Sequence, residues 1–295
     1  MTTAPIRPRR SILYMPAANA RALEKAQTLD ADGFIFDLED AVAPDAKENA
    51  RRQLHEALAR FDYRGRERVV RVNGLDTRWA ADDLRMAAAS SADAVLIPKV
   101  ESPATLHAAE AALAAAGAPP GQALWAMMET PRGFLRADAI AGATPRLGCL
   151  AMGTSDLAQE LRARHTPDRI ALLPSLGLGL LAARAHGLAA LDGVHLDLAD
   201  DAGFADACRQ SLVLGFDGKT LIHPKTIAVA NATFAPTAGQ VAWAERVTAA
   251  HAEAEAVGKG VVLVDGRLIE NLHVAEARRV LALADAIARW DLPSR

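Results

Sequence analysis

The chain has 295 residues, of which 51% are hydrophobic and only 4% aromatic, and its formal net charge at pH 7 is −3. A chain of this length can bury a large core, either in two domains or in one large α/β barrel. Acidic and basic residues are interspersed, which argues against nucleic acid or a membrane surface as the main partner. No stretch reaches the roughly 18 apolar residues of a membrane span, so we expect a cytoplasmic protein.

Short apolar runs alternate with longer segments of helical period over the first three quarters of the chain. Strands are predicted at residues 11–15, 33–38, 68–72, 94–98, 124–128, 147–152, 191–196 and 220–222. The helical stretches between them include residues 20–29, 46–61, 78–90, 103–116, 157–163 and 204–215. This alternation predicts βα units and a parallel sheet. Eight strands in a chain of this size favour a closed (β/α)8, or TIM, barrel. The rival is an open doubly wound sheet, but no GxGxxG follows the first strand.

The last sixty residues break this rhythm. Residues 236–257 read as a helix, residues 261–264 and 267–269 as a hairpin with an Asp-Gly turn, and residues 271–290 as a final helix. We therefore expect residues 1–235 to form a TIM barrel catalytic domain. Residues 236–295 are expected to be a helix–hairpin–helix extension of that domain, acting as a lid over the active-site mouth or as an oligomer contact.

Polar residues follow seven of the eight predicted strands. Active sites of TIM barrels lie at these C-terminal strand ends, because the βα loops surround the open mouth there. A single acidic residue at such a position is about as often the cap of the next helix, but convergence from several strands indicates a site. For His195, Asp197 and His223, ligand contact and capping both stay open. The residues are Asp37, Glu39, Asp40, Arg71, Asn73, Lys99, Glu129, Thr130, Thr154, Ser155, Asp156, His195, Asp197 and His223.

Glu129 and Asp156 come from neighbouring strands and would lie close together at the mouth. Like charges that close repel unless a cation or a proton lies between them. Two carboxylates, with water and substrate oxygens in the remaining positions, are the usual ligands of protein-bound Mg2+. Cys149 and Cys208 lack the spacing of metal ligands and read as buried reduced thiols. The sequence therefore predicts a Mg2+ site, which Mn2+ could also fill.

Two further groups at the mouth suit an anionic substrate. The planar fork of Arg71 can grip two carboxylate oxygens, or pair with the acidic residues that follow the neighbouring strand, and both can hold together. Gly153, Thr154 and Ser155 lie at a strand-to-helix turn and can offer backbone N–H groups to an anion.

Seven motifs in this order resemble those of the citrate lyase beta-subunit-like, or HpcH/HpaI aldolase, family, which includes malyl-CoA and citramalyl-CoA lyases. They cover nearly the whole chain from about residue 10 to residue 283. The motifs are Arg10-Ser11…Leu13-Tyr14-Met15-Pro16, Asp37-Leu38-Glu39-Asp40-Ala41-Val42, Arg71-Val72-Asn73, Pro98-Lys99, Met128-Glu129-Thr130-Pro131-Arg132-Gly133, Gly153-Thr154-Ser155-Asp156-Leu157 and Gly215-Phe216-Asp217-Gly218-Lys219…Ile222-His223-Pro224.

The resemblance implies roles for residues of this chain. Glu129 and Asp156 would be the Mg2+ ligands, Arg71 would hold the keto-acid carboxylate or enolate, and Asp37, Glu39 and Asp40 would support them. Positions matching Tyr14, Arg21, Lys25 and Lys47 would contact CoA. The family also implies a homotrimer or hexamer in which an acidic residue after the hairpin, commonly Asp and here Glu270, reaches a neighbouring subunit's site as acid or base.

The resemblance implies an enzyme, and the main expectation is a Mg2+-dependent carbon–carbon lyase. It would cleave or form a 3-hydroxyacyl-CoA, such as malyl-, methylmalyl- or citramalyl-CoA, yielding an acyl-CoA and a 2-keto acid. Four alternatives stay open: a citryl-acyl-carrier-protein lyase subunit of citrate lyase, a malyl-CoA thioesterase, a CoA-independent aldolase, and a non-catalytic acyl-CoA-binding scaffold.

Overall fold

The computed structural model describes residues 6–256, 258 and 260–290. Within this part, the chain forms two compact units. Arg9–Phe234 form one unit, and the residues from Ala235 onward, together with those before Arg9, form the other.

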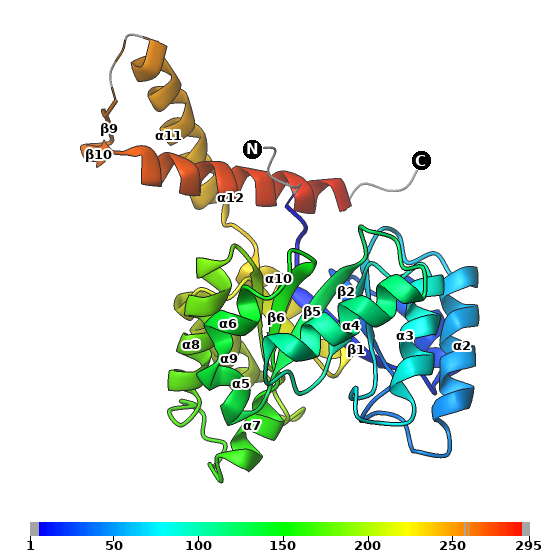
Figure 1. Ribbon diagram of the computed structural model, residues 1–295. Coiled ribbons are helices and arrows are strands. Elements are labelled where there is room, and N and C mark those ends of the chain that lie inside the picture. The colour runs from blue at the N-terminus through cyan, green and yellow to red at the C-terminus, as the bar shows by residue number, and fades with distance from the viewer. Residues whose placement is uncertain (1–5, 257, 259, 291–295) are drawn as a thin grey trace. The chain divides into compact units, whose positions relative to one another are not determined.

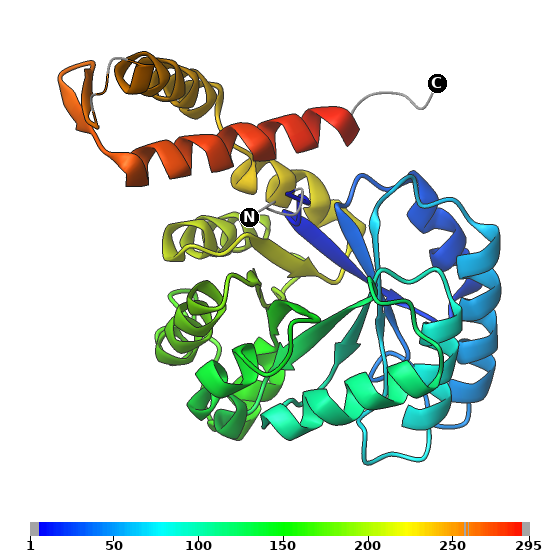
Figure 2. The same cartoon turned by 45° about the horizontal axis from the view of Figure 1, so that its top comes forward.

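The larger unit is a closed barrel of eight parallel strands in sequence order, in which the last strand pairs back with the first. This confirms the predicted TIM barrel fold, and Figure 2 shows the strands gathered inside a ring of helices. The strands are β1 (Ser11–Pro16), β2 (Gly33–Asp37), β3 (Glu67–Arg71), β4 (Ala94–Ile97), β5 (Ala123–Met128), β6 (Leu147–Met152), β7 (Ala189–Asp192) and β8 (Gly218–Leu221).

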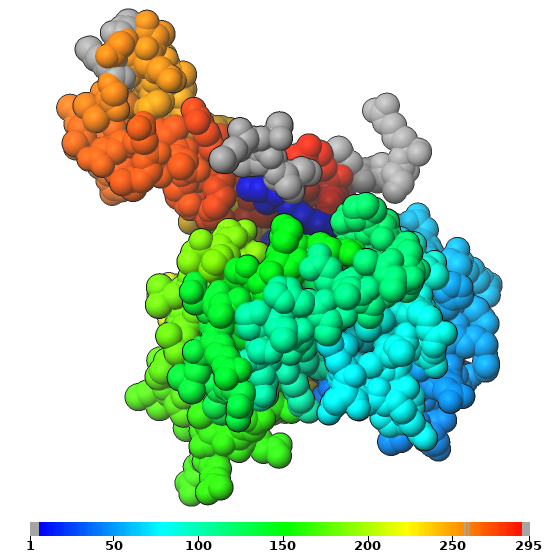
Figure 3. All heavy atoms as spheres, in the orientation of Figure 1, coloured from blue at the N-terminus to red at the C-terminus, as the bar shows by residue number. Residues whose placement is uncertain are grey.

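Helices follow the strands and form the outer layer (Figure 1). In the space-filling view of Figure 3, which has the orientation of Figure 1, the side chains of the helices cover most of the strands. The helices are α1 (Ala20–Lys25), α2 (Lys47–Arg60), α3 (Ala80–Ala89), α4 (Pro103–Ala115), α5 (Pro131–Leu135), α6 (Ala137–Ala141), α7 (Thr154–Glu160), α8 (Leu173–Ala185), α9 (Asp201–Leu214) and α10 (Ile227–Phe234), with 3-10 turns η1 (Ala26–Thr28) and η2 (Pro224–Thr226).

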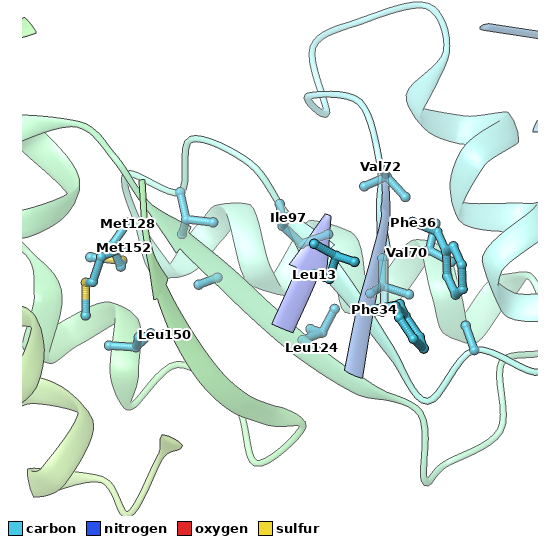
Figure 4. Packing of buried hydrophobic residues seen from close by; sticks show 14 of the residues in the cluster. Leu13, Phe34, Phe36, Val70, Val72, Ile97, Leu124, Met128, Leu150 and Met152 are labelled. Atoms are coloured by element: carbon cyan, nitrogen blue, oxygen red, sulfur yellow. The ribbon is translucent and has the colours of Figure 1, made fainter. Parts of the chain in front are cut away.

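Side chains of the strands alternate between two hydrophobic cores, because successive residues of a strand point to opposite faces. One core fills the barrel interior and includes Ile35, Val69 and Met127. The other lies between the strands and the helices, and Figure 4 shows ten of its labelled members, among them Phe34 and Val70. The barrel is therefore packed on both faces of its sheet.

The same alternation places charged groups at the mouth of the barrel. Asp37, Arg71 and Glu129 each follow an interior residue by two positions, so they point inward one step above the apolar core. An interior position at the C-terminal end of a strand is open to the βα loops rather than to other core side chains. The strand period thus directs these three side chains into one space.

Among the boundaries that differ from the sequence-based prediction, three affect the barrel mouth or the closure of the barrel. β7 ends at Asp192 rather than at residue 196, so His195 and Asp197 lie in a loop. β8 begins at Gly218, two residues early, where the chain passes so close to the Arg9 carbonyl that a Cβ would lie 1.8 Å from its oxygen. α7 begins at Thr154, three residues before the predicted start, which places Asp156 in its first turn.

A buried charge cluster joins β7, β8 and the loop before α8. Asp192 and Lys219 are both fully buried, and Lys219 Nζ lies 2.6 Å from Asp192 Oδ2. The same oxygen accepts a hydrogen bond from Arg169 Nη1 at 2.7 Å and another from the Ser211 hydroxyl. Two cations and a hydroxyl thus satisfy one buried carboxylate, as buried charges require.

The smaller unit contains α11 (Ala238–Ala256), the antiparallel hairpin β9 (Val262–Val264) and β10 (Arg267–Ile269), and α12 (Asn271–Trp290). Asp265 and Gly266 have φ values of +50° and +75°, the left-handed pair that a two-residue hairpin turn needs. Val247, Val264, Ile269 and other apolar residues form its own core. The predicted order of helix, hairpin and helix is therefore present. That this unit acts as a lid or as an oligomer contact remains a prediction. In the described part of the chain, no helix combines the length and apolarity needed to cross a bilayer.

Candidate active site

A cavity of about 390 Å³ opens at the C-terminal ends of the barrel strands. It brings together residues from β1, β2, β3, β5, β6, β8 and the loop after β7, and most of the expected site residues are among them. The lining residues are Tyr14, Pro16, Asp37, Asp40, Ala41, Arg71, Met127, Glu129, Met152, Gly153, Thr154, Ser155, Asp156, Val194, Leu196, Thr220 and Ile222.

Arg71 is held by the acidic residues that follow β2. Asp37 and Arg71 are partners in the register of β2 and β3, so their side chains meet on the inner face. Nε and Nη2 of Arg71 donate to the two oxygens of Asp37 at 2.8 and 2.6 Å. Nη1 lies 2.8 Å from Glu39 Oε2 and 3.3 Å from Asp40 Oδ2. The guanidinium also lies 5.1 Å from the centre of the Tyr14 ring, and its orientation is thereby fixed.

These contacts preserve the charge of Arg71. Burial alone would lower its pKa, but the hydrogen bonds and charge of Asp37 raise the pKa well above its ordinary value. The guanidinium is therefore a permanent positive charge beside the cavity. The ion pair with the acidic cluster is present, and a grip on a substrate carboxylate stays a prediction.

Glu129 is only 2% exposed, although it lines the cavity. Its Oε1 accepts a hydrogen bond from the backbone N–H of Lys99 at 2.7 Å. Burial raises the pKa of Glu129 to about 8, since the Lys99 N–H opposes the shift only in part and the charges of Glu39 and Asp156 add to it. Near neutral pH, this carboxyl group therefore holds a proton unless another cation takes its place.

Asp156 supplies the second carboxylate, from the first turn of α7. Its side chain is 36% exposed, and its Oδ1 lies 3.8 Å from Lys99 Nζ. In the described residues, no group of three or more His, Cys, Asp or Glu side chains is arranged as a metal site. Two carboxylates nevertheless suit Mg2+, which usually keeps several waters and takes one or two protein carboxylates. The buried, proton-holding Glu129 beside Asp156 fits such an ion.

The Glu39 carboxylate lies next to the guanidinium of Arg71. Burial raises its pKa to about 7, and the positive charge of Arg71 opposes that shift. Its Oε2 is buried and accepts no hydrogen bond of good geometry in the described structure, although it lies close to Arg71. Asp37 is held more tightly, because it also accepts the backbone N–H groups of Glu39 and Ala41 at 2.8 and 3.0 Å.

The expected CoA-contacting residues divide into two groups. Arg21 and Lys25 are exposed and lie one turn apart on α1, and Tyr14 lines the cavity. Lys47, the remaining residue expected to contact CoA, does not share this exposure. It is 6% exposed, and its ammonium donates to the carbonyls of Leu38 and Glu39 at 3.0 and 2.9 Å. Lys47 therefore fixes the acidic loop after β2.

The strand-to-helix turn after β6 is only partly available to an anion. The N–H of Gly153 donates to the Met128 carbonyl at 2.9 Å, so it continues the ladder between β5 and β6. This corrects the expectation that Gly153 would offer its own N–H. Thr154 and Ser155 line the cavity beyond it. Gly153 instead leaves room for the Glu129 side chain, because a Cβ on Gly153 would lie 2.4 Å from the Cβ of Glu129.

His195, Asp197 and His223 lie outside the cavity lining. Asp197 Oδ1 accepts the N–H of Ala199 at 2.9 Å, and His223 Nδ1 accepts that of Lys225 at 3.1 Å, so both stabilise turns. The His195 ring packs edge-on against Phe204 with centroids 5.9 Å apart. Glu270 lies in the smaller unit, where it is exposed and its N–H donates to His273 Nδ1 at 3.0 Å.

Comparison with known proteins places this geometry in a family. The model of the family described as HpcH/HpaI aldolase/citrate lyase matches residues 10–224. The chain belongs to this family. The Mycobacterium tuberculosis family member CitE, solved in complex with magnesium, acetoacetate and coenzyme A, is 30% identical and superposes with a TM-score of 0.74. That comparison covers 96% of this chain and 99% of CitE.

Relatives that match nearly the whole chain differ in their sequence identity to it. A (3S)-malyl-CoA thioesterase of Cereibacter sphaeroides is 53% identical over 283 residues, covering 96% of this chain and 97% of the relative. A citrate lyase subunit beta of Escherichia coli is 38% identical over 284 residues, covering 95% and 94%. The expectation of a family enzyme is confirmed. The main expectation of a carbon–carbon lyase is wrong, because four relatives that are 52–53% identical over 283 residues are (3S)-malyl-CoA thioesterases.

Proposed function

We propose that this protein is a Mg2+-dependent thioesterase that hydrolyses malyl-CoA to malate and free CoA. The observation that carries the proposal is the 53% identity, over nearly the full length of both chains, to a (3S)-malyl-CoA thioesterase. The cavity supports it, because it combines two carboxylates suited to a divalent cation with a buried guanidinium. A hydroxy acid joined to a thioester presents the oxygens that such groups bind.

Glu129 and Asp156 would hold Mg2+, and the bound ion would act as a Lewis acid on substrate oxygens. Arg71 supplies a second positive charge at the same wall of the cavity. Asp37 fixes its orientation through two hydrogen bonds, so the charge needs no rearrangement during reaction. Gly153 leaves the space that Glu129 occupies. These residues bind and orient the acyl end of the substrate.

Hydrolysis also needs a base that takes a proton from the attacking water as its oxygen bonds to the thioester carbon. The carbon–sulfur bond then breaks, and the CoA sulfur leaves and receives a proton. We assign the acid/base role to Glu270, which follows the hairpin where family members commonly have Asp. Glu39 is the second candidate, since burial raises its pKa to about 7. Comparing kcat of Glu270→Gln with kcat of Glu39→Gln would separate them.

Product analysis tests the proposal. The protein would be incubated with malyl-CoA and Mg2+, and free thiol, malate and 2-keto acid would be measured together. We expect thiol and malate in equal amounts, and no reaction in EDTA. Asp156→Ala should abolish turnover while the protein stays folded. A 2-keto acid formed without free thiol would reject hydrolysis, and full activity of EDTA-treated Asp156→Ala protein would reject the metal site.

The expected CoA contacts of Tyr14, Arg21 and Lys25 and the trimeric or hexameric assembly, with sites completed by a neighbouring subunit, remain part of the proposal. Arg21 and Lys25 are supported by their exposure on one helix, α1. Cytoplasmic location likewise remains a prediction from the sequence. Replacing Arg21 and Lys25 together by Ser would test the CoA contacts, since KM for malyl-CoA should rise with little change in kcat.

A further inference from the structure

The Pro98-Lys99 motif after β4 has an unusual backbone conformation. Lys99 has a φ of +48°, in the left-handed region that non-glycine residues rarely adopt. The next residue, Val100, is fully buried, and its N–H donates to the Met127 carbonyl at 3.3 Å. The residue after Lys99 is thus fixed by burial and by a backbone hydrogen bond to β5. A left-handed lysine in such a fixed turn is a candidate for a functional constraint.

This turn directs the backbone of Lys99 to Glu129. The N–H of Lys99 donates to Glu129 Oε1 at 2.7 Å, which fixes that side of the carboxyl group. The other oxygen, Oε2, is the one on the side of Gly153, where an added Cβ would lie 2.6 Å from it. The backbone of Lys99 therefore lies directly beside the proposed metal ligand.

The side chain of Lys99 lies near carboxylates that follow three different strands, β2, β5 and β6. Its Nζ is 3.8 Å from Asp156 Oδ1, and in the described structure no other carboxylate oxygen lies within 4.0 Å of it. The charges of Glu39, Asp156, Glu129 and Asp40 together raise its pKa. The side chain is 52% exposed. Unlike the guanidinium of Arg71, this ammonium has no hydrogen bond to a carboxylate in the described structure, so it can turn to another anion.

We propose that Lys99 is a substrate-binding residue whose ammonium lies beside Asp156 when no divalent cation is bound and pairs with the free carboxylate of the acyl substrate once the cation is bound. An ion held by Glu129 and Asp156 would repel the ammonium that lies 3.8 Å from the same Asp156 carboxylate, so we expect Mg2+ to displace the Lys99 side chain. A malyl group brings its own free carboxylate, which gives the displaced ammonium a partner. This second step rests on the proposed function, whereas the first does not.

Calorimetric titration with Mg2+ tests the first step. Lys99→Met removes the competing charge, so we expect it to bind Mg2+ about three- to tenfold more tightly than the native protein at low ionic strength. The difference should shrink at high salt, because half-exposed charges are screened. Lys99→Arg keeps the charge and should bind Mg2+ as the native protein does. Lys99→Asn, which tolerates a left-handed backbone, should behave as Lys99→Met does, and it replaces that variant if the latter fails to fold.

Binding of malate to the Mg2+-saturated protein tests the second step. Lys99→Met should weaken malate binding about tenfold, whereas Lys99→Arg should bind malate about as tightly as the native protein does. A residue needed only for folding would weaken the binding of both ligands. Equal or weaker Mg2+ binding by both Lys99→Met and Lys99→Asn overturns the proposal. If Mg2+ binding tightens but the native protein does not hydrolyse malyl-CoA, the proposed function fails while the displacement of Lys99 by the metal stands.

Discussion

Gly153 lies directly against the side chain of Glu129: a Cβ on Gly153 would lie 2.4 Å from Glu129 Cβ and 2.6 Å from its Oε2. Main-chain pairing of β5 and β6 causes this closeness, because the N–H of Gly153 donates to Met128, the residue before Glu129. Gly153 cannot move away without breaking its hydrogen bond to Met128, so a side chain at position 153 would clash with Glu129.

Gly153→Ala should therefore displace Glu129 and weaken Mg2+ binding at least tenfold, with little loss of folded structure. Gly148→Ala on the preceding strand, β6, is the matched control, since its added Cβ would lie 3.7 Å from the nearest atom, an ordinary contact. Calorimetry would give the Mg2+ affinity, and circular dichroism would report the fold. Equal Mg2+ affinity in the two variants would contradict the tight fit described here.

Binding of Mg2+ should release protons below pH 8. The pKa of Glu129 in the metal-free protein is raised to about 8, chiefly by burial, so below that pH the ion must displace a proton. Affinity should fall by up to about tenfold per pH unit below pH 8 and level off above it. Titrations in buffers of different ionisation enthalpy would count the protons. Affinity that stays constant between pH 6 and pH 8 would show that Glu129 is already ionised.

Arg71→Lys should lower kcat/KM roughly 10- to 100-fold, because a lysine keeps the charge but cannot make both hydrogen bonds to Asp37. Steady-state kinetics with malyl-CoA would measure the loss. Arg68→Lys, on the same strand, is the control, since Arg68 pairs with Asp93 and does not line the cavity. If both variants kept native kcat/KM, the oriented guanidinium would have no part in the reaction.

Asp192→Asn should destabilise the barrel by about 3–5 kcal/mol, because it leaves the fully buried ammonium of Lys219 without its carboxylate. Urea unfolding would measure the change. Asp138→Asn breaks only an exposed contact with His186 and should change stability little. Similar midpoints for the two variants would mean that the buried cluster contributes no more than a surface pair.

The sequence sufficed for the barrel and for much of its mouth, because strand period and chain order are both local patterns. Once β2, β3 and β5 are located, alternation alone directs Asp37, Arg71 and Glu129 inward. The end of β7 is not evident from the sequence, because Val194 and Leu196 continue the apolar alternation past Asp192, whereas pairing with β8 ends there.

Roles that depend on tertiary contacts could not be predicted in this way. Lys47 looks like a surface charge in the sequence, and only the folded chain shows its ammonium buried against two carbonyls. The left-handed turn at Lys99 leaves no trace in composition, since glycine or asparagine would be the expected residue there. The proposal of water attack rather than carbon–carbon cleavage rests on the similarity to thioesterases, because one carboxylate set can serve both reactions.

The most direct test of hydrolysis is to run the reaction with malyl-CoA and Mg2+ in water enriched in oxygen-18 and analyse the acid by mass spectrometry. Attack of water on the thioester carbon predicts malate with one heavy oxygen, in the carboxyl group that had been joined to sulfur, with one free CoA thiol per malate. A 2-keto acid accompanied by an intact acyl-CoA thioester would contradict the account.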